Sequence, residues 1–306
     1  MNESARTLPN WVYYLVILSA TIIWGGDFVI AKTAVSLVSA TWVVAIRFFL
    51  GGLLLAAIFA PRMKRCLTPA ALRAGMIIGV CSFLGYWTQF VGLSGTTPAK
   101  NAFLSTCYCV VVPFVVWIVQ RQRPTRRNLL AACICVAGLA LVTLPGGGSL
   151  QVSWGDGVSM LSALTYSFEI VAVSIFLRDN DVIAVSAVQM VTVGLLATLV
   201  GCFEGLPSAE ALGDKRFILA MLYITLLAST YGATAQNLAQ RHIAAGPVSM
   251  LLALESVFGT IFSVIFFHEV LTLRMLVGFA LIFTAVVLCT WQPRGKERTW
   301  SPSSPS

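Results

Sequence analysis

Long apolar runs, separated by short polar or basic stretches, dominate the chain from end to end. A helix needs about 20 consecutive, mainly apolar residues to cross the hydrocarbon core of a bilayer. The pattern predicts membrane-spanning helices at 12–33, 39–60, 73–93, 97–119, 128–144, 155–177, 182–203, 217–238, 246–267 and 271–291. Most connections are too short to fold separately. The sequence therefore predicts an all-α integral membrane protein with ten transmembrane helices.

The composition supports this assignment and excludes a soluble globule. Of 306 residues, 58% are hydrophobic and only 10% are charged, and the mean hydropathy is +0.87. Soluble domains carry roughly 25% charged residues, which cover their surface. The net charge of +8 would suggest a nucleic-acid partner in a soluble protein. In a membrane protein, basic loops on one side of the bilayer explain the charge, so no nucleic-acid partner is expected.

Lysine and arginine also predict the orientation, because basic residues concentrate in cytoplasmic loops. If the N-terminus is inside, fourteen lie on the cytoplasmic side: Arg6, Arg62, Lys64, Arg65, Arg73, Arg121, Arg123, Arg126, Arg127, Arg178, Arg241, Arg294, Lys296 and Arg298. Five lie outside: Lys32, Lys100, Lys215, Arg216 and Arg274. Both termini are therefore expected in the cytoplasm. The first apolar run continues past any plausible cleavage point, so no cleavable signal peptide is expected.

Several residues that often carry chemistry have a simpler interpretation here. The eight cysteines lie mostly inside apolar runs and are interpreted as small packing residues. His242 and His268 stand at span ends without other ligands nearby, so no metal site is predicted. Gly75 and Gly79 form a G-x-x-x-G pattern that allows close helix packing. No nucleotide-binding loop is present, and no cofactor is expected.

The order of polar residues predicts an internal duplication. A shift of 142 aligns Trp24 with Tyr166, Asp27 with Glu169, Arg47 with Gln189, and Gly52-Leu53-Leu54 with Gly194-Leu195-Leu196; shifts of 147 and 149 align Gln89 with Gln236 and Pro98 with Pro247. A repeat of five helices must insert the second time upside down. We therefore expect two inverted five-helix repeats, at 1–149 and 150–292, joined through 144–151. The polar tail at 293–306 is expected to be disordered.

Three stretches carry a resemblance to a known family. They are "IIWGGDFVIAK" in the first span, "AIRF" in the second, and "LESVFGTIFSVIFFHEVLT" near the end. With the order of spans, they resemble the drug/metabolite transporter superfamily, in its ten-helix, EamA-type branch of inner-membrane metabolite exporters. The resemblance implies a bacterial inner-membrane location and small polar metabolites as substrates. The chain departs from the family pattern at two positions. Asp27 stands where a small or amide residue is common after the Trp-Gly pair, and Ser256 stands where a proline often follows the glutamate of the predicted ninth span.

Two charges within the first two spans are expected to meet. At about 1.5 Å per residue, Asp27 lies roughly 9 Å and Arg47 roughly 12 Å from the outer end of its span. Adjacent antiparallel helices bring such residues to the same depth. A structural ion pair is one interpretation, and a role of Asp27 in binding substrate or protons is the other.

Glu169 occupies the mirrored depth, but its corresponding neighbour is Gln189 rather than an arginine. A carboxyl group without a cation in a low-dielectric environment favours its neutral form and can take up and release protons. Glu255 falls at a similar depth in the ninth span. Proton coupling by Glu169 or Glu255 is therefore one hypothesis, and hydrogen bonding for packing alone is the alternative.

Aromatic and amide side chains at comparable depth are candidates for a substrate cavity. They are Trp24, Tyr86, Trp87, Gln89, Tyr108, Tyr166, Gln189, Gln236 and Asn237. Trp24 and Tyr166 each precede an acidic residue by three positions and so share its helix face. Aromatic rings can stack on a cationic ligand. Packing or interfacial roles are the alternative for each aromatic residue.

Together these features predict a secondary transporter that works by alternating access. Carboxylates with few cations suit amino acids or related amines, and the resemblance implies export. An uncoupled facilitator of the same substrates is one alternative. An integral-membrane enzyme is another, although no clustered catalytic motif is seen. A lipid bilayer and a small-molecule substrate are the expected partners, and the protein is expected to be a monomer or a homodimer.

Overall fold

The computed structural model describes residues 9–143, 152–267 and 272–290, and every regular element in these ranges is helical. The all-α prediction is thereby confirmed for the described chain. The predicted joint at 144–151, the tail at 293–306 and His268 lie outside the described residues.

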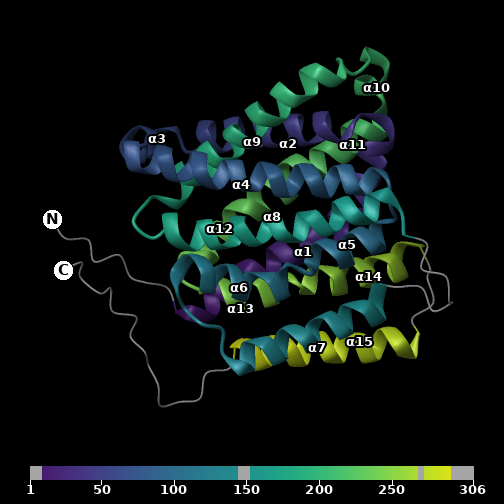
Figure 1. The fold of residues 1–306 in the computed structure, drawn as a ribbon. Helices are drawn as coiled ribbons and strands as arrows, with labels where there is room; N and C mark the ends of the chain where they lie inside the picture. The colour runs from purple at the N-terminus through teal and green to yellow at the C-terminus, as the bar shows by residue number, and fades with distance from the viewer. Residues whose placement is uncertain (1–8, 144–151, 268–271, 291–306) are drawn as a thin grey trace.

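The helices follow one another with short connections (Figure 1). The first half contains α1 (Asn10–Leu37), α2 (Ala40–Ile58), α3 (Ala60–Cys66), α4 (Pro69–Ser94), α5 (Pro98–Thr106), α6 (Tyr108–Gln120) and α7 (Arg126–Thr143). The second half contains α8 (Trp154–Phe176), α9 (Val182–Glu204), α10 (Ala209–Gly213), α11 (Lys215–Tyr223), the π-helix η1 (Ile224–Ala233), α12 (Thr234–Gln240), α13 (Ala245–Leu252), α14 (Leu254–Phe267) and α15 (Leu273–Thr290).

Eight helical segments of the described chain are long and apolar enough to cross a membrane: Trp11–Leu37, Ala40–Ile58, Pro69–Ser94, Lys100–Gln120, Trp154–Phe176, Val182–Glu204, Lys215–Gln240 and Ala245–Phe262. The other two predicted spans fall on α7, which starts with two arginines, and on α15, whose apolar part is shorter. Large apolar side chains such as Ile118, Phe203 and Phe283 point outward. Such a surface fits a hydrocarbon environment rather than water.

The helices lie side by side in a bundle with two opposite ends (Figure 1). At one end, the ring of Tyr13 near the start of α1 lies 3.8 Å from that of His242 after α12. At this end Arg62 of α3 also pairs with Asp181 before α9, at 2.7 Å, and Gln120 at the end of α6 donates to Ser174 near the end of α8. We call this the basic end, because it holds Arg62, Lys64, Arg65, Arg73, Arg121, Arg123, Arg126, Arg127, Arg178 and Arg241.

The remaining helix termini meet at the opposite end. Lys32 near the end of α1 donates to the carbonyl oxygens of Leu93 and Ser94 at the end of α4 and of Thr96 just after it. Trp42 at the start of α2 donates to the carbonyl of Gly205 after α9. Other contacts at this end are Lys100 with Asp156 at the start of α8, and Arg274 of α15 with the Ala140 carbonyl of α7. Successive long helices therefore run in alternating directions.

Glycines allow the central helices to pack closely. In α2, a Cβ added at Gly52 would lie 2.8 Å from Val191, and in α9 one added at Gly194 would lie 2.6 Å from Phe49. In α1, a Cβ at Gly25 would lie 2.7 Å from the backbone nitrogen of Gly259 in α14. The backbones of these helix pairs thus touch, as small residues permit in membrane bundles. This contact holds α1, which carries Asp27, against α14, which carries Glu255.

Two of the spans are interrupted near their middle. The predicted fourth span breaks at Cys107 between α5 and α6, and the predicted ninth span breaks at Ala253 between α13 and α14. The second break lies three residues before Ser256, where no proline is present. Backbone groups freed at such breaks are tolerated inside a membrane protein where they are buried in protein or line a cavity.

Candidate functional site

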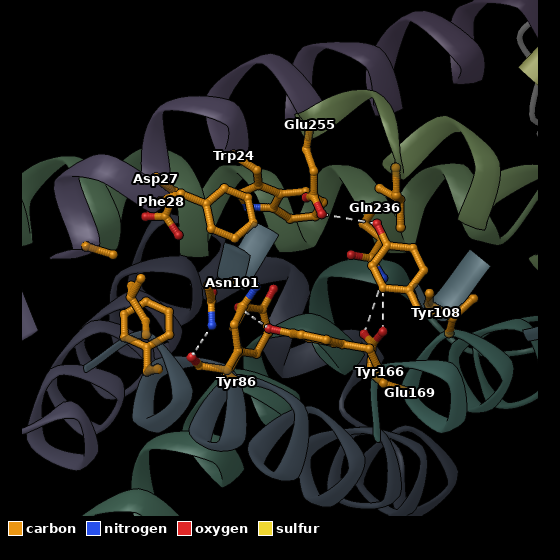
Figure 2. Close-up of a pocket in the computed structure, with 16 residues that line it drawn as sticks. Trp24, Asp27, Phe28, Tyr86, Asn101, Tyr108, Tyr166, Glu169, Gln236 and Glu255 are labelled. Carbon is orange, nitrogen blue, oxygen red and sulfur yellow. Dashed lines mark hydrogen bonds between the residues drawn. The ribbon is translucent and has the colours of Figure 1, made fainter. Parts of the chain in front are cut away.

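A cavity of about 50 Å³ lies between α1, α4, α5, α6, α8, α12, α13 and α14 (Figure 2). It has room for only a few water molecules. Its walls are formed by Trp24, Asp27, Phe28, Ala31, Tyr86, Gln89, Phe90, Leu93, Asn101, Tyr108, Tyr166, Glu169, Ile170, Gln236, Leu252 and Glu255. Both halves of the chain therefore contribute, and both interrupted spans border the cavity.

Asp27 of α1 and Arg47 of α2 lie together inside the bundle. Nη1 of Arg47 is 3.3 Å from Oδ2 of Asp27. Arg47 is completely buried, and Asp27 is 8% exposed on the cavity wall. The pair neutralises two charges that would each be costly alone in this environment.

Arg47 has further contacts that do not involve Asp27. Its Nε donates to the hydroxyl of Ser229 in η1, at 2.6 Å. The rings of Phe48, Tyr86 and Phe90 lie with their centroids 4.9 to 5.5 Å from the guanidinium carbon. Cation–π contacts of this kind stabilise a desolvated guanidinium.

Glu169 of α8 is 4% exposed and has amide rather than cationic neighbours. Gln236 Nε2 donates to its two carboxylate oxygens at 3.3 and 3.1 Å, as Figure 2 shows. Gln189 and Ser82 also lie beside the carboxylate. Among the described residues, the acidic members of the ion pairs are Asp27, Asp156, Asp181 and Asp214. Within that part of the chain, Glu169 is thus a buried carboxyl group without a cationic partner.

Glu255 lies in the first turn of α14, directly after the break at Ala253 between α13 and α14. Its Oε1 accepts hydrogen bonds from Thr106 at 3.1 Å and from Tyr108 at 3.2 Å. These two donors flank Cys107, where the fourth span breaks. The two interruptions therefore meet through one carboxylate, which also benefits from the positive N-terminal end of α14.

Tyrosines and amides form the rest of the polar wall. The hydroxyl of Tyr166 donates to Gln89 Oε1 at 2.6 Å, and Asn101 donates to the Gln89 carbonyl at 3.0 Å. The ring of Tyr166 packs edge-on against Tyr86 and Tyr108, at 5.2 and 6.3 Å between centroids. A cluster of this kind offers ring faces and fixed hydrogen-bonding groups to a ligand.

Trp24 connects the cavity wall to the π-helix η1. Its Nε1 donates to the Ala228 carbonyl at 2.8 Å, and a Cβ added at Gly232 would lie 2.8 Å from the same nitrogen. Thr230 donates to the Thr225 carbonyl, five residues before it. These side chains satisfy carbonyls within the π-helical stretch. π-helical turns occur often at functional sites.

Six of the predicted aromatic and amide residues line the cavity: Trp24, Tyr86, Gln89, Tyr108, Tyr166 and Gln236. Three do not. Trp87 donates to Thr41 and stacks on Phe83, whereas Gln189 and Asn237 bond to each other behind Glu169.

The cause is helix geometry. Trp87 follows Tyr86, and Asn237 follows Gln236, so each points about 100° away from its neighbour, and only one of each pair can face the cavity. Asn101 was not predicted, although its amide would have been a usable signal. Phe28, Phe90, Ile170 and Leu252 look like ordinary packing residues in the sequence.

The described residues contain no group of three or more histidine, cysteine, aspartate or glutamate side chains that could hold a metal ion. What the cavity offers is three carboxylates, several ring faces and neutral amides. This set can bind a cation, accept hydrogen bonds and exchange protons.

Comparisons with known proteins place these features in context. The model of the EamA-like transporter family matches residues 11–144 and again 153–291. An uncharacterized transporter of Archaeoglobus fulgidus is 27% identical over 267 residues, which cover 87% of this chain and 82% of that protein. The uncharacterized transporter YvbV of Bacillus subtilis is 22% identical and covers 95% of this chain and 96% of its own length.

Two further matches are a relative with a named substrate and a solved structure. A transporter of S-adenosylmethionine and S-adenosylhomocysteine from Chlamydia muridarum is 24% identical over 48% of this chain and 46% of its own length. One crystal structure of another protein superposes with a TM-score of 0.74 at 16% identity, covering 92% of this chain and 96% of that one. At this identity the superposition describes the fold alone.

Proposed function

Because the chain belongs to the EamA-like transporter family and is an integral membrane protein, we propose that it moves amines or amino acids across the bilayer by alternating access. The observation that carries this proposal is the buried cavity between the two halves, lined by three carboxylates and four aromatic side chains of the tryptophan and tyrosine type. We propose export as the direction of transport, on the resemblance to metabolite exporters alone.

The proposed architecture is ten spans in two inverted five-helix repeats. The family model matches each half separately, which supports a duplication. Under the shift of 142, Phe49 corresponds to Val191 and Gly52 to Gly194. The contact of Gly52 with Val191 therefore has its image in the contact of Gly194 with Phe49. A two-fold related pair of repeats would produce such reciprocal contacts.

A second pair of contacts supports the same relation. Gly232 packs on the ring of Trp24, and Gly85 packs on the ring of Tyr166. The two aromatic positions differ by 142 and the two glycines by 147, the shifts found in the sequence. The first helix, α1, starts at the basic end, whereas α8 starts at the opposite end, as an inverted repeat requires.

We place the basic end in the cytoplasm. Of the described lysines and arginines at the two ends, ten lie there and five lie at the opposite end. An excess of basic residues on the cytoplasmic side is the rule for inner-membrane proteins. The N-terminus and C-terminus would then both be cytoplasmic.

Glu169 is our candidate for proton coupling, with Glu255 as the second. Each is buried, each faces the cavity, and each is held by neutral hydrogen-bond donors. A carboxyl group in such a site can exist without charge and can exchange its proton when the cavity opens to water. Asp27 is less suited, because Arg47 stabilises its ionised form.

The test is uptake of radiolabelled compounds into proteoliposomes, with and without an imposed pH gradient. The panel contains amino acids, the corresponding amines and, because of the Chlamydia relative, S-adenosylmethionine. Wild type is compared with Glu169→Gln, and with Asp214→Asn, a change at a partly exposed aspartate of the opposite end. We expect gradient-driven flux that Glu169→Gln abolishes and Asp214→Asn retains.

Flux that is equal in all three proteins and indifferent to the gradient would refute proton coupling. That result would favour an uncoupled facilitator, in which the acidic residues only hold the helices together. Absence of flux for every compound of the panel would refute the proposed substrate class.

A further inference from the structure

Asp27 is the cavity carboxylate whose hydrogen-bonding capacity the protein uses least. Its Oδ2 accepts one hydrogen bond, from Arg47, whereas its Oδ1 has no hydrogen-bond partner among the described residues. Both atoms are buried, and the residue is 8% exposed. Buried carboxylate oxygens ordinarily have a donor, because an unpaired one is costly. Figure 2 shows the carboxylate of Asp27 pointing away from α1 into the cavity.

The hydrogen bond between Asp27 and Arg47 is also the longer of the two that the Arg47 side chain makes to other described side chains. At 3.3 Å it is longer than the roughly 2.7–2.9 Å usual for a charge-assisted hydrogen bond. The bond to Ser229 is 2.6 Å, and three aromatic rings surround the guanidinium. Arg47 can therefore keep its position when Asp27 takes another partner.

The residues that line the cavity include three carboxylates and neither lysine nor arginine. Arg47 lies behind Asp27 and does not belong to this wall. A cationic ligand in the cavity would face Asp27 Oδ1, Glu255 and the rings of Trp24 and Tyr86. A free carboxylate group of a ligand would meet three acidic side chains without a cation in contact.

We propose that Asp27 Oδ1 is the subsite for the ammonium group of the substrate, with Arg47 as a counter-ion that stays in place. The cavity then selects organic amines over zwitterionic amino acids and excludes anions. This inference rests on the proposed function, because it takes the cavity to be the transport site. It narrows the substrate class to compounds with a positive charge and without a free carboxylate.

The experiment measures binding rather than transport, by ligand-induced stabilisation of the purified protein in detergent. A ligand that binds the folded state raises the unfolding temperature, and the stabilisation grows with the logarithm of the ratio of ligand concentration to dissociation constant. Two matched sets are used: isopentylamine, leucine and N-acetylleucine, and phenethylamine, phenylalanine and N-acetylphenylalanine. Within each set the apolar side chain is constant while the charge changes from positive to zwitterionic to negative.

We expect wild type to bind at least one amine and to bind it about tenfold or more tightly than its amino acid, as one charge-assisted hydrogen bond allows. The N-acetyl compounds should not bind. Asp27→Asn should lose this preference, and Asp214→Asn should keep it. Because Asp27→Asn leaves Arg47 buried without its counter-ion, the double variant Asp27→Asn/Arg47→Leu is measured as well; it removes both charges and should also lose amine binding.

Amine binding that survives in the double variant within about threefold would overturn the proposal, since one charge-assisted hydrogen bond is worth more. So would tighter binding of the amino acid or its N-acetyl derivative by wild type, or binding of neither amine. Failure of the proposed function can be distinguished from failure of this inference. Amine-selective binding without flux in proteoliposomes would support the Asp27 subsite and refute transport.

Discussion

Replacement of Arg47 by leucine should destabilise the protein strongly, because it leaves Asp27 buried without a cation. At the observed 3.3 Å, two unit charges attract by about 5 kcal/mol with an effective dielectric constant of about 20. Loss of one partner of a buried pair costs about 3–5 kcal/mol in measured cases. We therefore expect Arg47→Leu to lower the free energy of unfolding by about 3 kcal/mol or more.

The reverse change should cost less. Asp27→Asn leaves Arg47 its bond to Ser229 and its three aromatic neighbours, and desolvated cation–π contacts contribute about 2 kcal/mol. The double variant Asp27→Asn/Arg47→Leu contains no buried charge at either site. Its stability should therefore exceed that of Arg47→Leu alone, which is a strong departure from additivity.

The assay is reversible unfolding in mixed detergent micelles, followed by circular dichroism, for wild type and the three variants. The four free energies form a double-mutant cycle that isolates the interaction of the pair. A loss below about 1 kcal/mol for Arg47→Leu, as exposed pairs show, would contradict the burial of this pair. Strict additivity in the double variant would show that the two side chains do not interact.

Three further predictions concern other parts of the molecule. Gly232→Ala places a Cβ against the indole ring of Trp24 and should cost about 1–3 kcal/mol, measured by thermal unfolding. Gly157→Ala, at an open position, should be neutral or slightly stabilising. Equal effects of the two changes would contradict the close packing at Gly232. At the basic end, burial acts against ionisation of Asp181, but the hydrogen bond from Arg62 and the capped amides of α9 hold its pKa below the usual value. The contribution of Asp181 to stability is therefore full above about pH 4 and is lost as the pH falls through the lowered pKa. Asp181→Ala should cost about 1 kcal/mol of unfolding free energy at pH 7, whereas Asp181→Asn, which keeps the cap, should cost less. A fluorescent protein fused to the C-terminus should fold and fluoresce in cells, and a dark fusion at normal expression would refute the cytoplasmic assignment.

The sequence predicts depth in the bundle well, because depth depends only on position within an apolar run. Asp27 and Arg47 are expected at similar depth, and the structure brings them to 3.3 Å. The sequence does not predict which side of each helix faces the cavity, because these helices are apolar on nearly all sides. Trp87 and Asn237 are at suitable depth but on the wrong side of their helices.

The pattern of apolar residues also does not predict where a helix departs locally from α-helical geometry. The breaks at Cys107 and Ala253 carry neither proline nor glycine, so no residue there signals an interruption. The π-helix at Ile224–Ala233 has the same apolar character as an α-helix. Both features depend on partners from distant segments, such as the indole of Trp24 on the Ala228 carbonyl.

The contacts between α2 and α9 restrict which parts of the protein can move. At one end of this pair, Thr41 and Trp42 bond to Glu204 and Gly205. At the other end, Arg62 just beyond α2 pairs with Asp181 at the start of α9, and glycines keep the two backbones in contact between these ends. A helix pair that is fixed at both ends and in contact between them cannot change its crossing angle without loss of the contacts at its two ends. Opening of the cavity toward either side of the membrane, which the proposed alternating access requires, is therefore expected to come from the interrupted helices and from α1, moving relative to a rigid α2–α9 frame.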